Sequence, residues 1–390
     1  RDRRQQRCPA GPAPGGMRRH DGATMTDTLL QPWAEAIDEF PIEGTHAEQL
    51  CAAARRATLA PSSHNTQPWL FRVSGSTLDL YADRSRAQPI VDPDQRELTI
   101  SCGAALYIIR LTLARFGLDT RCRVLPDPRD PDLLARVTLD GTREPDVQLQ
   151  RLYNAISTRR TNRNPFEERP IPRHVIARIV AAVEAQGARI QMVSDELLLA
   201  NIAELVAEAD RAQMASTAFR HELAQSIHFN RSPKRDGMPG HALGLGDLAS
   251  ALGPVVVRNF DLGPATARRD VALIAESPAL AVLWSRKDTP RHWLRTGQAL
   301  AALLLNLQAD GVSASFLNQP MQVVPLRERL RALLDCPGSP QLVLRLGYAP
   351  DVAPTPRRDP DEVIVNLSPR VQANFSGAHH TMGVEPNKED

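Results

Sequence analysis

Residues 59–70, Leu-Ala-Pro-Ser-Ser-His-Asn-Thr-Gln-Pro-Trp-Leu, narrow most strongly what this chain can build. Pro61 and Pro68 bracket the stretch, and proline both stops a helix and removes a backbone donor. Between them stand four side chains that donate or accept hydrogen bonds, with no glycine: Ser62, Ser63, Asn65 and Gln67. A connecting turn needs no such density of polar groups. We therefore predict a loop that binds a polar, planar ligand.

Two arginine-bearing segments follow much later in the chain. The first, residues 155–166, contains Arg159 and Arg163, which share one helix face if the helix continues. Its alternative interpretation is a solvated basic helix end, where arginine is favourable anyway. The second segment, residues 346–359, ends in two arginines that could complete an anion site or form a charged linker: Arg357 and Arg358.

These three motifs, in this order, resemble the nitroreductase family of flavoproteins, and in particular its Acg branch. The resemblance implies FMN as the cofactor. It assigns the loop to the flavin ring, the first arginine segment to the phosphate, ribityl chain and ring edge, and a later strand end to flavin N5. In this chain the corresponding residues are Pro61, Ser62, Ser63, Asn65 and Gln67 for the loop, Arg159, Arg160, Thr161 and Arg163 for the first segment, Asn318 and Gln319 for the strand end, and Arg357 and Arg358 for the phosphate.

Two of these positions would carry catalytic roles by the same resemblance. Arg163 would stabilise the charge of the reduced ring, and the backbone amide near Asn318 would meet N5. Many relatives have an acidic residue and a glycine at the positions of Asn318 and Gln319, a change that a backbone contact tolerates. His64 is better explained as a loop histidine near the ring edge than as half of a Ser–His pair, because the chain has no Gly-x-Ser-x-Gly motif.

Composition excludes several other classes of protein. The chain has 390 residues, 42% of them hydrophobic and 24% charged, with a net charge of +2 and no basic block, so nucleic acid is not an expected partner. We expect no membrane span and no metal site. The five cysteines are scattered without a Cys-x-x-Cys pair, so we expect reduced thiols and a cytoplasmic location.

Hydrophobic periodicity predicts both helices and strands, and the resemblance implies that they form an α+β protein with mixed, mainly antiparallel strands and flanking helices. Residues 69–73 and 77–82 read as a hairpin, and residues 97–116 as a helix that is apolar nearly all round and hence buried. Further helices are predicted at 47–60, 172–186, 195–214, 290–309 and 326–334, and further strands at 134–139, 280–284 and 342–346. We expect residues 1–24, a disordered or upstream extension, and residues 368–390, a tail, to lack structure.

A faint internal repeat divides the remainder. Gly103 and Gly297 begin similar Gly-x-Ala-Leu motifs, and their separation, 297 − 103 = 194, recurs between Pro126 and Pro320. Chance agreement between small residues on helices is the alternative. Together with the resemblance, the repeat implies two nitroreductase-like halves, residues 25–150 and 151–367, fused into a monomeric pseudo-dimer with one FMN. The second half would carry a long irregular insertion at about 213–262, expected to act as a lid.

The resulting functional hypothesis is an FMN-dependent oxidoreductase. It would take hydride from NAD(P)H and pass it through flavin N5 to a nitroaromatic, a quinone or a similar small-molecule acceptor. The alternative is a protein that stores or sequesters FMN behind a closed lid with little turnover. A flavin-fragmenting or azoline-oxidising activity on the same fold is a third, weaker possibility that fold analogy does not separate.

Overall fold

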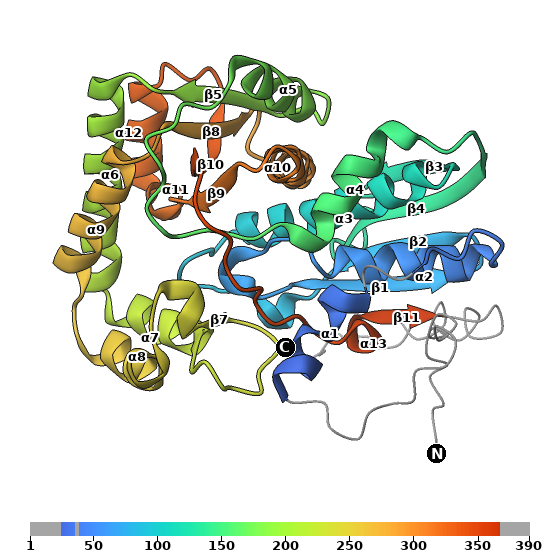
Figure 1. The fold of residues 1–390 in the computed structure, drawn as a ribbon, viewed down its shortest axis with the longest axis horizontal. Coiled ribbons are helices and arrows are strands. Elements are labelled where there is room, and N and C mark those ends of the chain that lie inside the picture. Colours follow the sequence, from blue (N-terminus) through green and yellow to red (C-terminus); the bar gives the residue numbers. More distant parts are fainter. Residues whose placement is uncertain (1–24, 36–38, 367–390) are drawn as a thin grey trace, which may run out of the picture.

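The computed structural model describes residues 25–35 and 39–366 (Figure 1). The expectations for residues 1–24 and 368–390 fall outside that range. The helices are α1 (Met25–Glu35), α2 (His46–Ala57), α3 (Arg96–Arg115), α4 (Gln150–Thr158), α5 (Arg173–Glu184), α6 (Glu196–Ala215), α7 (Thr217–Ser226), α8 (Asp247–Asn259), α9 (Gly263–Ala275), α10 (Pro290–Ala309), α11 (Gln319–Gln322), α12 (Val324–Leu333) and α13 (Pro360–Val363). The strands are β1 (Trp69–Ser74), β2 (Thr77–Ala82), β3 (Leu118–Val124), β4 (Leu133–Thr142), β5 (Arg189–Val193), β6 (Ile227–His228), β7 (Met238–Pro239), β8 (Ala279–Ser285), β9 (Ser313–Phe316), β10 (Ser339–Gly347) and β11 (Ile364–Asn366).

Two separate sheets organise the molecule. The first has the strand order β11-β1-β2-β4-β3, and the second has the order β5-β8-β10-β9. All neighbours in them are antiparallel except β11, which runs parallel to β1. The predicted α+β class with mainly antiparallel sheets is confirmed. Strands β5 and β11 and helices α1 and α9 are among the elements that have no counterpart in the prediction.

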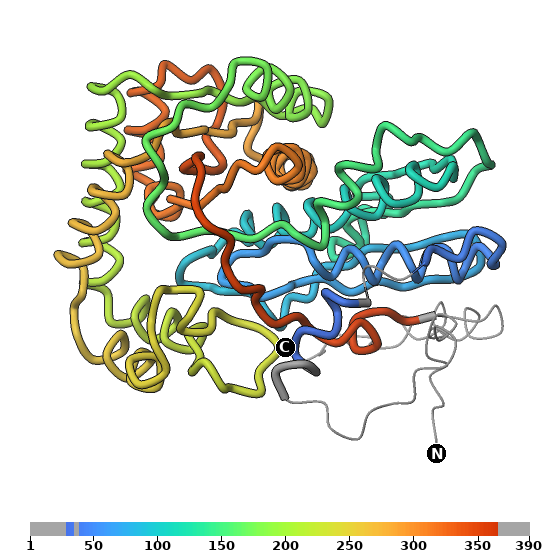
Figure 2. The backbone as a smooth tube through the Cα atoms, in the orientation of Figure 1, coloured from blue at the N-terminus to red at the C-terminus, as the bar shows by residue number. Residues whose placement is uncertain are grey.

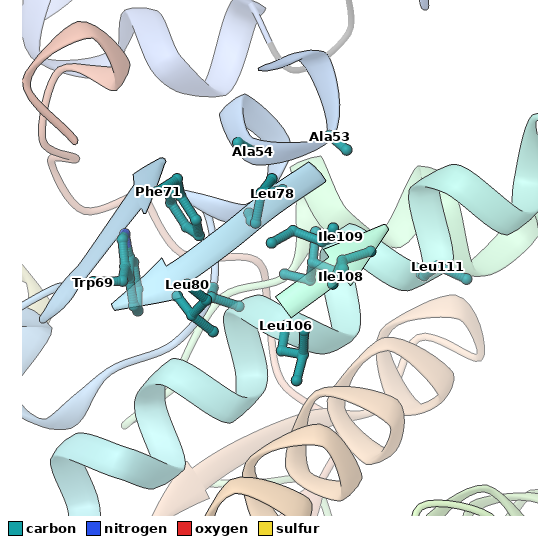
Figure 3. Close-up of a cluster of buried hydrophobic side chains, with 14 of the residues drawn as sticks. Ala53, Ala54, Trp69, Phe71, Leu78, Leu80, Leu106, Ile108, Ile109 and Leu111 are labelled. Atoms are coloured by element: carbon teal, nitrogen blue, oxygen red, sulfur yellow. The ribbon is translucent and has the colours of Figure 1, made fainter. Parts of the chain in front are cut away.

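Helices α2 and α3 cover the first sheet and share a core with it. Figure 3 shows the inward side chains of β1 and β2, among them Trp69 and Leu80, meeting Leu106 and Ile109 of α3. Helix α2 begins with a capping box, in which the Thr45 hydroxyl accepts from one backbone N–H and a glutamate returns the bond. This core fixes the start of the polar loop that leads from α2 into β1.

Helices α3 and α10 cross at the centre of the molecule (Figure 1). Gly103 and Gly297 meet at the crossing, and a Cβ built on Gly297 would lie 1.9 Å from the Ile100 carbonyl oxygen and 2.7 Å from the Gly103 Cα. Only glycine permits two backbones to approach so closely. The glycines singled out by the 194-residue repeat therefore contact each other directly.

Helix α3 is also long and apolar enough to cross a membrane, the only one among the described residues that is. However, 83% of its apolar stretch is buried inside the protein, as expected for a core helix. Within the same residues, Cys102, Cys122 and Cys336 carry free thiols.

The last described segment connects the two sheets. After β10 the chain leaves the second sheet, passes across the molecule and pairs with the first through β11, with Phe71 opposite Ile364 (Figure 2). This path carries Arg357 and Arg358 to the polar loop of residues 61–68.

The region 213–262 differs from the irregular insertion that the sequence predicts. It contains the helices α7 and α8, the short parallel pair β6–β7 and a 3-10 turn at Gly240–Leu243. Turn-forming residues suggested a loop, but the apolar run within residues 248–257 forms α8, and Pro254 lies inside it. Figure 1 places this region beside the first sheet and next to α6 and α9.

Candidate active site

A cavity of about 600 Å³ opens where the polar loop, both arginine segments and the 213–262 region converge. Ligand pockets in proteins span roughly 300–1,000 Å³, so its size suits a ligand as large as a nucleotide. Eleven of the residues predicted from the sequence line it: Pro61, Ser62, Ser63, Asn65, Arg159, Arg160, Thr161, Arg163, Asn318, Gln319 and Arg357. Gln67 and Arg358 are not among the lining residues.

The polar loop holds an unusual backbone. His64, Asn65 and Gln67 have φ values of 46°, 58° and 53°, in the left-handed region that non-glycine residues seldom adopt. Such strain persists only where the surroundings enforce it, and it concentrates at functional sites. Here the Ser62 hydroxyl accepts a hydrogen bond from the Gln67 backbone N–H, and the Ser63 hydroxyl donates to Glu97.

Gln67 stabilises this loop from behind and does not face the cavity. Its side chain is fully buried, donates to the Arg235 carbonyl at 2.8 Å and accepts from the Arg358 backbone N–H at 2.7 Å. The Arg358 guanidinium in turn donates to the Gln67 carbonyl and pairs with Asp83. The prediction that the Gln67 and Arg358 side chains face the ligand is therefore not supported, because both side chains form hydrogen bonds that stabilise the loop itself.

Asn65 connects three segments that are distant in sequence. Its amide donates to the Gly237 carbonyl at 2.9 Å and to the Pro356 carbonyl at 3.1 Å, while its carbonyl oxygen accepts from Arg357 at 2.8 Å. The polar loop, the 213–262 region and the C-terminal crossing segment are thus tied together at one wall of the cavity.

Three arginines concentrate positive charge at one end of the cavity. Arg159 and Arg357 are 4% and 3% exposed. No carboxylate among the described residues lies within ion-pair distance of either of them or of Arg160. Burial and the neighbouring Arg160 lower the pKa of Arg159 to about 9, and burial together with Arg159 and Arg160 lowers the pKa of Arg357 well below its ordinary value. Buried cations are stable when an anion accompanies them, so this cluster has the chemistry of a phosphate site.

Trp33 of α1 stacks against two members of this cluster. The guanidinium carbons of Arg160 and Arg357 lie 3.9 Å and 4.7 Å from the centre of its ring, and its indole N–H donates to the Thr355 carbonyl at 2.8 Å. Cation–π stacking of this kind orients guanidinium groups without neutralising them. Trp33 also lines the cavity, which the sequence did not indicate.

Arg163 lies apart from that cluster. It donates to the Ala242 carbonyl at 3.1 Å, so it contacts the 213–262 region. Burial and Arg269 lower its pKa to about 10, whereas Asp270 opposes that shift. The chain leaves the helix at Arg159, which has an extended backbone, so the helical spacing that would align Arg159 and Arg163 does not apply.

Two carboxylates, Glu97 and Asp210, also line the site. Glu97 is saturated by Ser63, Arg96 and Gln322, so its role is to hold the base of the cavity. Asp210 of α6 also lines the cavity and accepts from the Gln319 side chain at 3.1 Å. Asn318 accepts from the Val343 backbone N–H through its side-chain oxygen, which fixes the turn after β9.

The remaining wall is apolar and comes mainly from the 213–262 region. Its lining side chains are Met214, Phe219, Leu223, Ile227, Met238, Leu243, Leu245, Val257 and Leu262. Together with the arginine cluster, this wall gives the cavity a cationic end and an apolar side. Such a division suits a ligand with a phosphate and an aromatic ring system.

Sequence reasoning missed Asp210, Arg269 and Trp33 as lining residues. One of them had a readable signal, because Asp210 lies four positions after Val206 and eight after Ile202, on the buried face of α6. A carboxylate on such a face is rare and asks for an explanation. Trp33 and Arg269 gave no comparable signal.

Comparison with known proteins places the chain in a family. The sequence pattern of the Nitroreductase family matches residues 156–348. Two Mycobacterium tuberculosis proteins that carry the provisional name NAD(P)H nitroreductase are similar: Rv3131, 31% identical over 82% of this chain and 91% of that protein, and acg, 29% identical over 80% and 94%. A solved FMN-dependent nitroreductase, NfnB from Mycobacterium smegmatis, is 17% identical over 55% of this chain and 97% of its own chain, with a TM-score of 0.37. On the match to the family pattern and to Rv3131, the chain belongs to the nitroreductase family.

Proposed function

We propose that the protein is an FMN-dependent oxidoreductase that takes electrons from NAD(P)H. The observation that carries this proposal is the cluster of the buried Arg159 and Arg357 with the half-buried Arg160 at one end of the cavity. The residues fit FMN, because the cluster suits a phosphate and the Arg357 Nε is a buried donor with no hydrogen-bond partner among the described residues. When bound, FMN supplies the two-electron transfer between donor and acceptor.

The chain's own residues would then position the cofactor and exclude water from it. The arginine cluster would hold the phosphate, and Pro61, Ser62, Ser63 and Asn65 would lie along the ring system. Thr161 and Arg163 would face the ribityl chain and the polar ring edge, with Asn318 and Gln319 at the turn after β9. The apolar wall of the 213–262 region would exclude water and act as the lid.

The proposed architecture of the chain is a fused pair of halves. We propose that residues 25–150 and 151–367 act as two nitroreductase-like halves of a monomeric pseudo-dimer with one FMN. Three features support it: the contact between Gly103 and Gly297, the equal bounds of α3 and α10 at an offset of 290 − 96 = 194, and a cavity lined from both sides of the crossing.

The acceptor would be a planar, apolar molecule, either a nitroaromatic or a quinone. The apolar lining of the 213–262 region supports this class, since a sugar or a charged substrate would find few partners there. Membership of the family favours turnover over the alternative of FMN storage.

Turnover measurements test this function directly. The FMN-loaded protein should oxidise NADH or NADPH in the presence of menadione or a nitrobenzoate, and an Arg163→Ala variant should react more slowly. If the loaded wild-type protein consumes neither nucleotide with either acceptor, the oxidoreductase assignment is wrong.

A further inference from the structure

Asp210 is a buried carboxylate in the cavity wall, and the proposed function so far assigns it no role. It is 3% exposed, and its Oδ2 atom has no hydrogen-bond partner among the described residues. Its other oxygen accepts from the Gln319 amide. An unpaired buried carboxylate oxygen costs free energy unless the group is protonated or meets a ligand.

A second carboxylate shares the same partner. The Gln319 amide nitrogen donates to Asp210 at 3.1 Å and to Asp270 of α9 at 2.7 Å, so one side chain bridges two acids. Two carboxyl groups held together in this way seldom ionise together. Burial, followed by the charge of Asp270, raises the pKa of Asp210 to about 7, and burial raises the pKa of Asp270 as well.

The surrounding charges decide which acid keeps the proton. Asp270 lies in the field of Arg269, Arg345 and Arg163, all of which favour its ionised form. Asp210 has only Arg211 beside it, and no cation among the described residues lies within ion-pair distance. These charges favour the ionised form of Asp270 over the ionised form of Asp210.

Among the described residues, the charges that act most strongly on Asp210 are those of Asp270 and Arg211. On α12, which packs against α6, Arg329 pairs with Glu208 on the exposed face of α6. The polar groups that face Asp210 are thus Gln319 and Asp270, together with Arg211 on its own helix.

The reduction of the acceptor requires a proton at this place. A quinone takes up two electrons and two protons to become a hydroquinone; one proton arrives with the electron pair, and the second must come from an acid. A nitro group likewise takes up two electrons and two protons, losing one oxygen as water to give a nitroso group. Each reduction therefore calls for one proton donor beside the acceptor.

We propose that Asp210 is the proton donor to the bound acceptor and that Asp270, through Gln319, keeps it protonated. The O–H bond of the Asp210 carboxyl breaks, the acceptor oxygen gains that proton, and the carboxylate recovers a proton from water. This inference rests on the proposed oxidoreductase function. A positioned acid of this kind contributes about 10²–10⁴-fold to a rate.

The first test needs no cofactor. Protein labelled with ¹³C at aspartate carboxyls is titrated by NMR, and the Asp210 resonance is identified by its loss in Asp210→Asn. We expect a midpoint near the pKa of about 7, and a midpoint more than one pH unit lower in Asp270→Asn, because that substitution removes a neighbouring negative charge. An Asp210 midpoint near 4 in the wild-type protein would overturn the proposal.

The second test separates the two half-reactions by stopped flow. In Asp210→Asn we expect NADPH to reduce the bound flavin at the wild-type rate. Reoxidation of the flavin by menadione at pH 6 should be at least 10²-fold slower than in the wild type. The wild-type reoxidation rate should fall as pH rises through 7, and the rate of the variant should not. Glu208→Gln, on the exposed face of the same helix, should leave both half-reactions and FMN affinity unchanged. Reoxidation by Asp210→Asn at the wild-type rate would sink the inference alone, whereas failure of wild-type reduction by NADPH would sink the proposed function.

Discussion

Individual residues account for the affinity of the cavity for an anion. Arg159, Arg160 and Arg357 are brought together from two segments almost 200 positions apart, and Trp33 stacks against two of them. Desolvation lowers the pKa values of all three, although Arg160 is only half-buried. An anion at this point would relieve that cost, so each arginine should contribute to binding beyond its own hydrogen bonds.

Replacement of Arg357 tests this at the level of one side chain. Arg357→Met keeps the length and removes the charge, so we expect the Kd for FMN to rise by about 10–100-fold, the value of one or two charge-assisted hydrogen bonds. Fluorescence titration of the apoprotein measures it. Arg231→Met removes an exposed arginine that pairs with Asp247, and should leave the Kd unchanged. Equal affinities in all three proteins would contradict the phosphate assignment.

His64 makes a prediction about pH. Its Nδ1 atom lies 2.6 Å from the Gln88 amide nitrogen, and burial, with a smaller effect of Arg163, lowers its pKa to about 4. The unfolded chain binds this proton near pH 6.5, so the folded state loses stability as pH falls from about 6.5 to 4. A shift of that size is worth up to ~3 kcal/mol, and we expect about 1–2 because the side chain faces the cavity.

Urea denaturation at a series of pH values checks this expectation. His64→Asn, which tolerates the left-handed backbone, should lose less stability than the wild type between pH 6.5 and 4. Parallel curves for the two proteins would show that His64 does not remain neutral in the folded state.

At the scale of elements, the backbones of α3 and α10 approach closely where the two helices cross at Gly103 and Gly297. Gly297→Ala would place a Cβ against the backbone of α3, and no flexible side chain could move to relieve it. We expect a loss of about 3 kcal/mol or more, the upper end for overpacked cores. Gly253→Ala, within α8, meets nothing nearer than 3.6 Å and should gain about 0.5–1 kcal/mol. Thermal unfolding of both variants tests the crossing, and a neutral Gly297→Ala would refute it.

The same scale shows what the sequence could predict and what it could not. The hairpin at 69–82 and the helix α10 follow from local apolar patterns, and the buried helix α3 follows from a run that is apolar nearly all round. Strand β11 is only three residues long and forms because it pairs with β1 across the whole chain. Helix α8 lay within a stretch dominated by Gly, Pro and charge, so its apolar run was outweighed.

The candidate site divides in the same way. Local motifs predicted the lining residues of the polar loop and the arginine segments. Gln67 and Arg358 were misplaced because their orientation depends on the left-handed backbone and on the crossing segment, neither of which local patterns encode. Asp210 became significant only when α6 and α9 brought Asp270 beside it.

On the scale of the whole molecule, the cavity belongs to no single segment. The first sheet supplies the polar loop, residues 159–163 and the turn after β9 come from the second half of the chain, and the crossing segment brings Arg357 back to the first sheet. A site assembled in this way within one chain should need no second copy. The proposed pseudo-dimer therefore predicts one complete flavin site per chain.

An absorbance spectrum of the purified protein, followed by anaerobic addition of NADPH, tests this account most directly. We predict flavin bands at one FMN per chain in a monomer, bleached by NADPH. Half an FMN per chain in a dimer would contradict the fused site. A protein that binds no flavin after reconstitution would contradict the account as a whole.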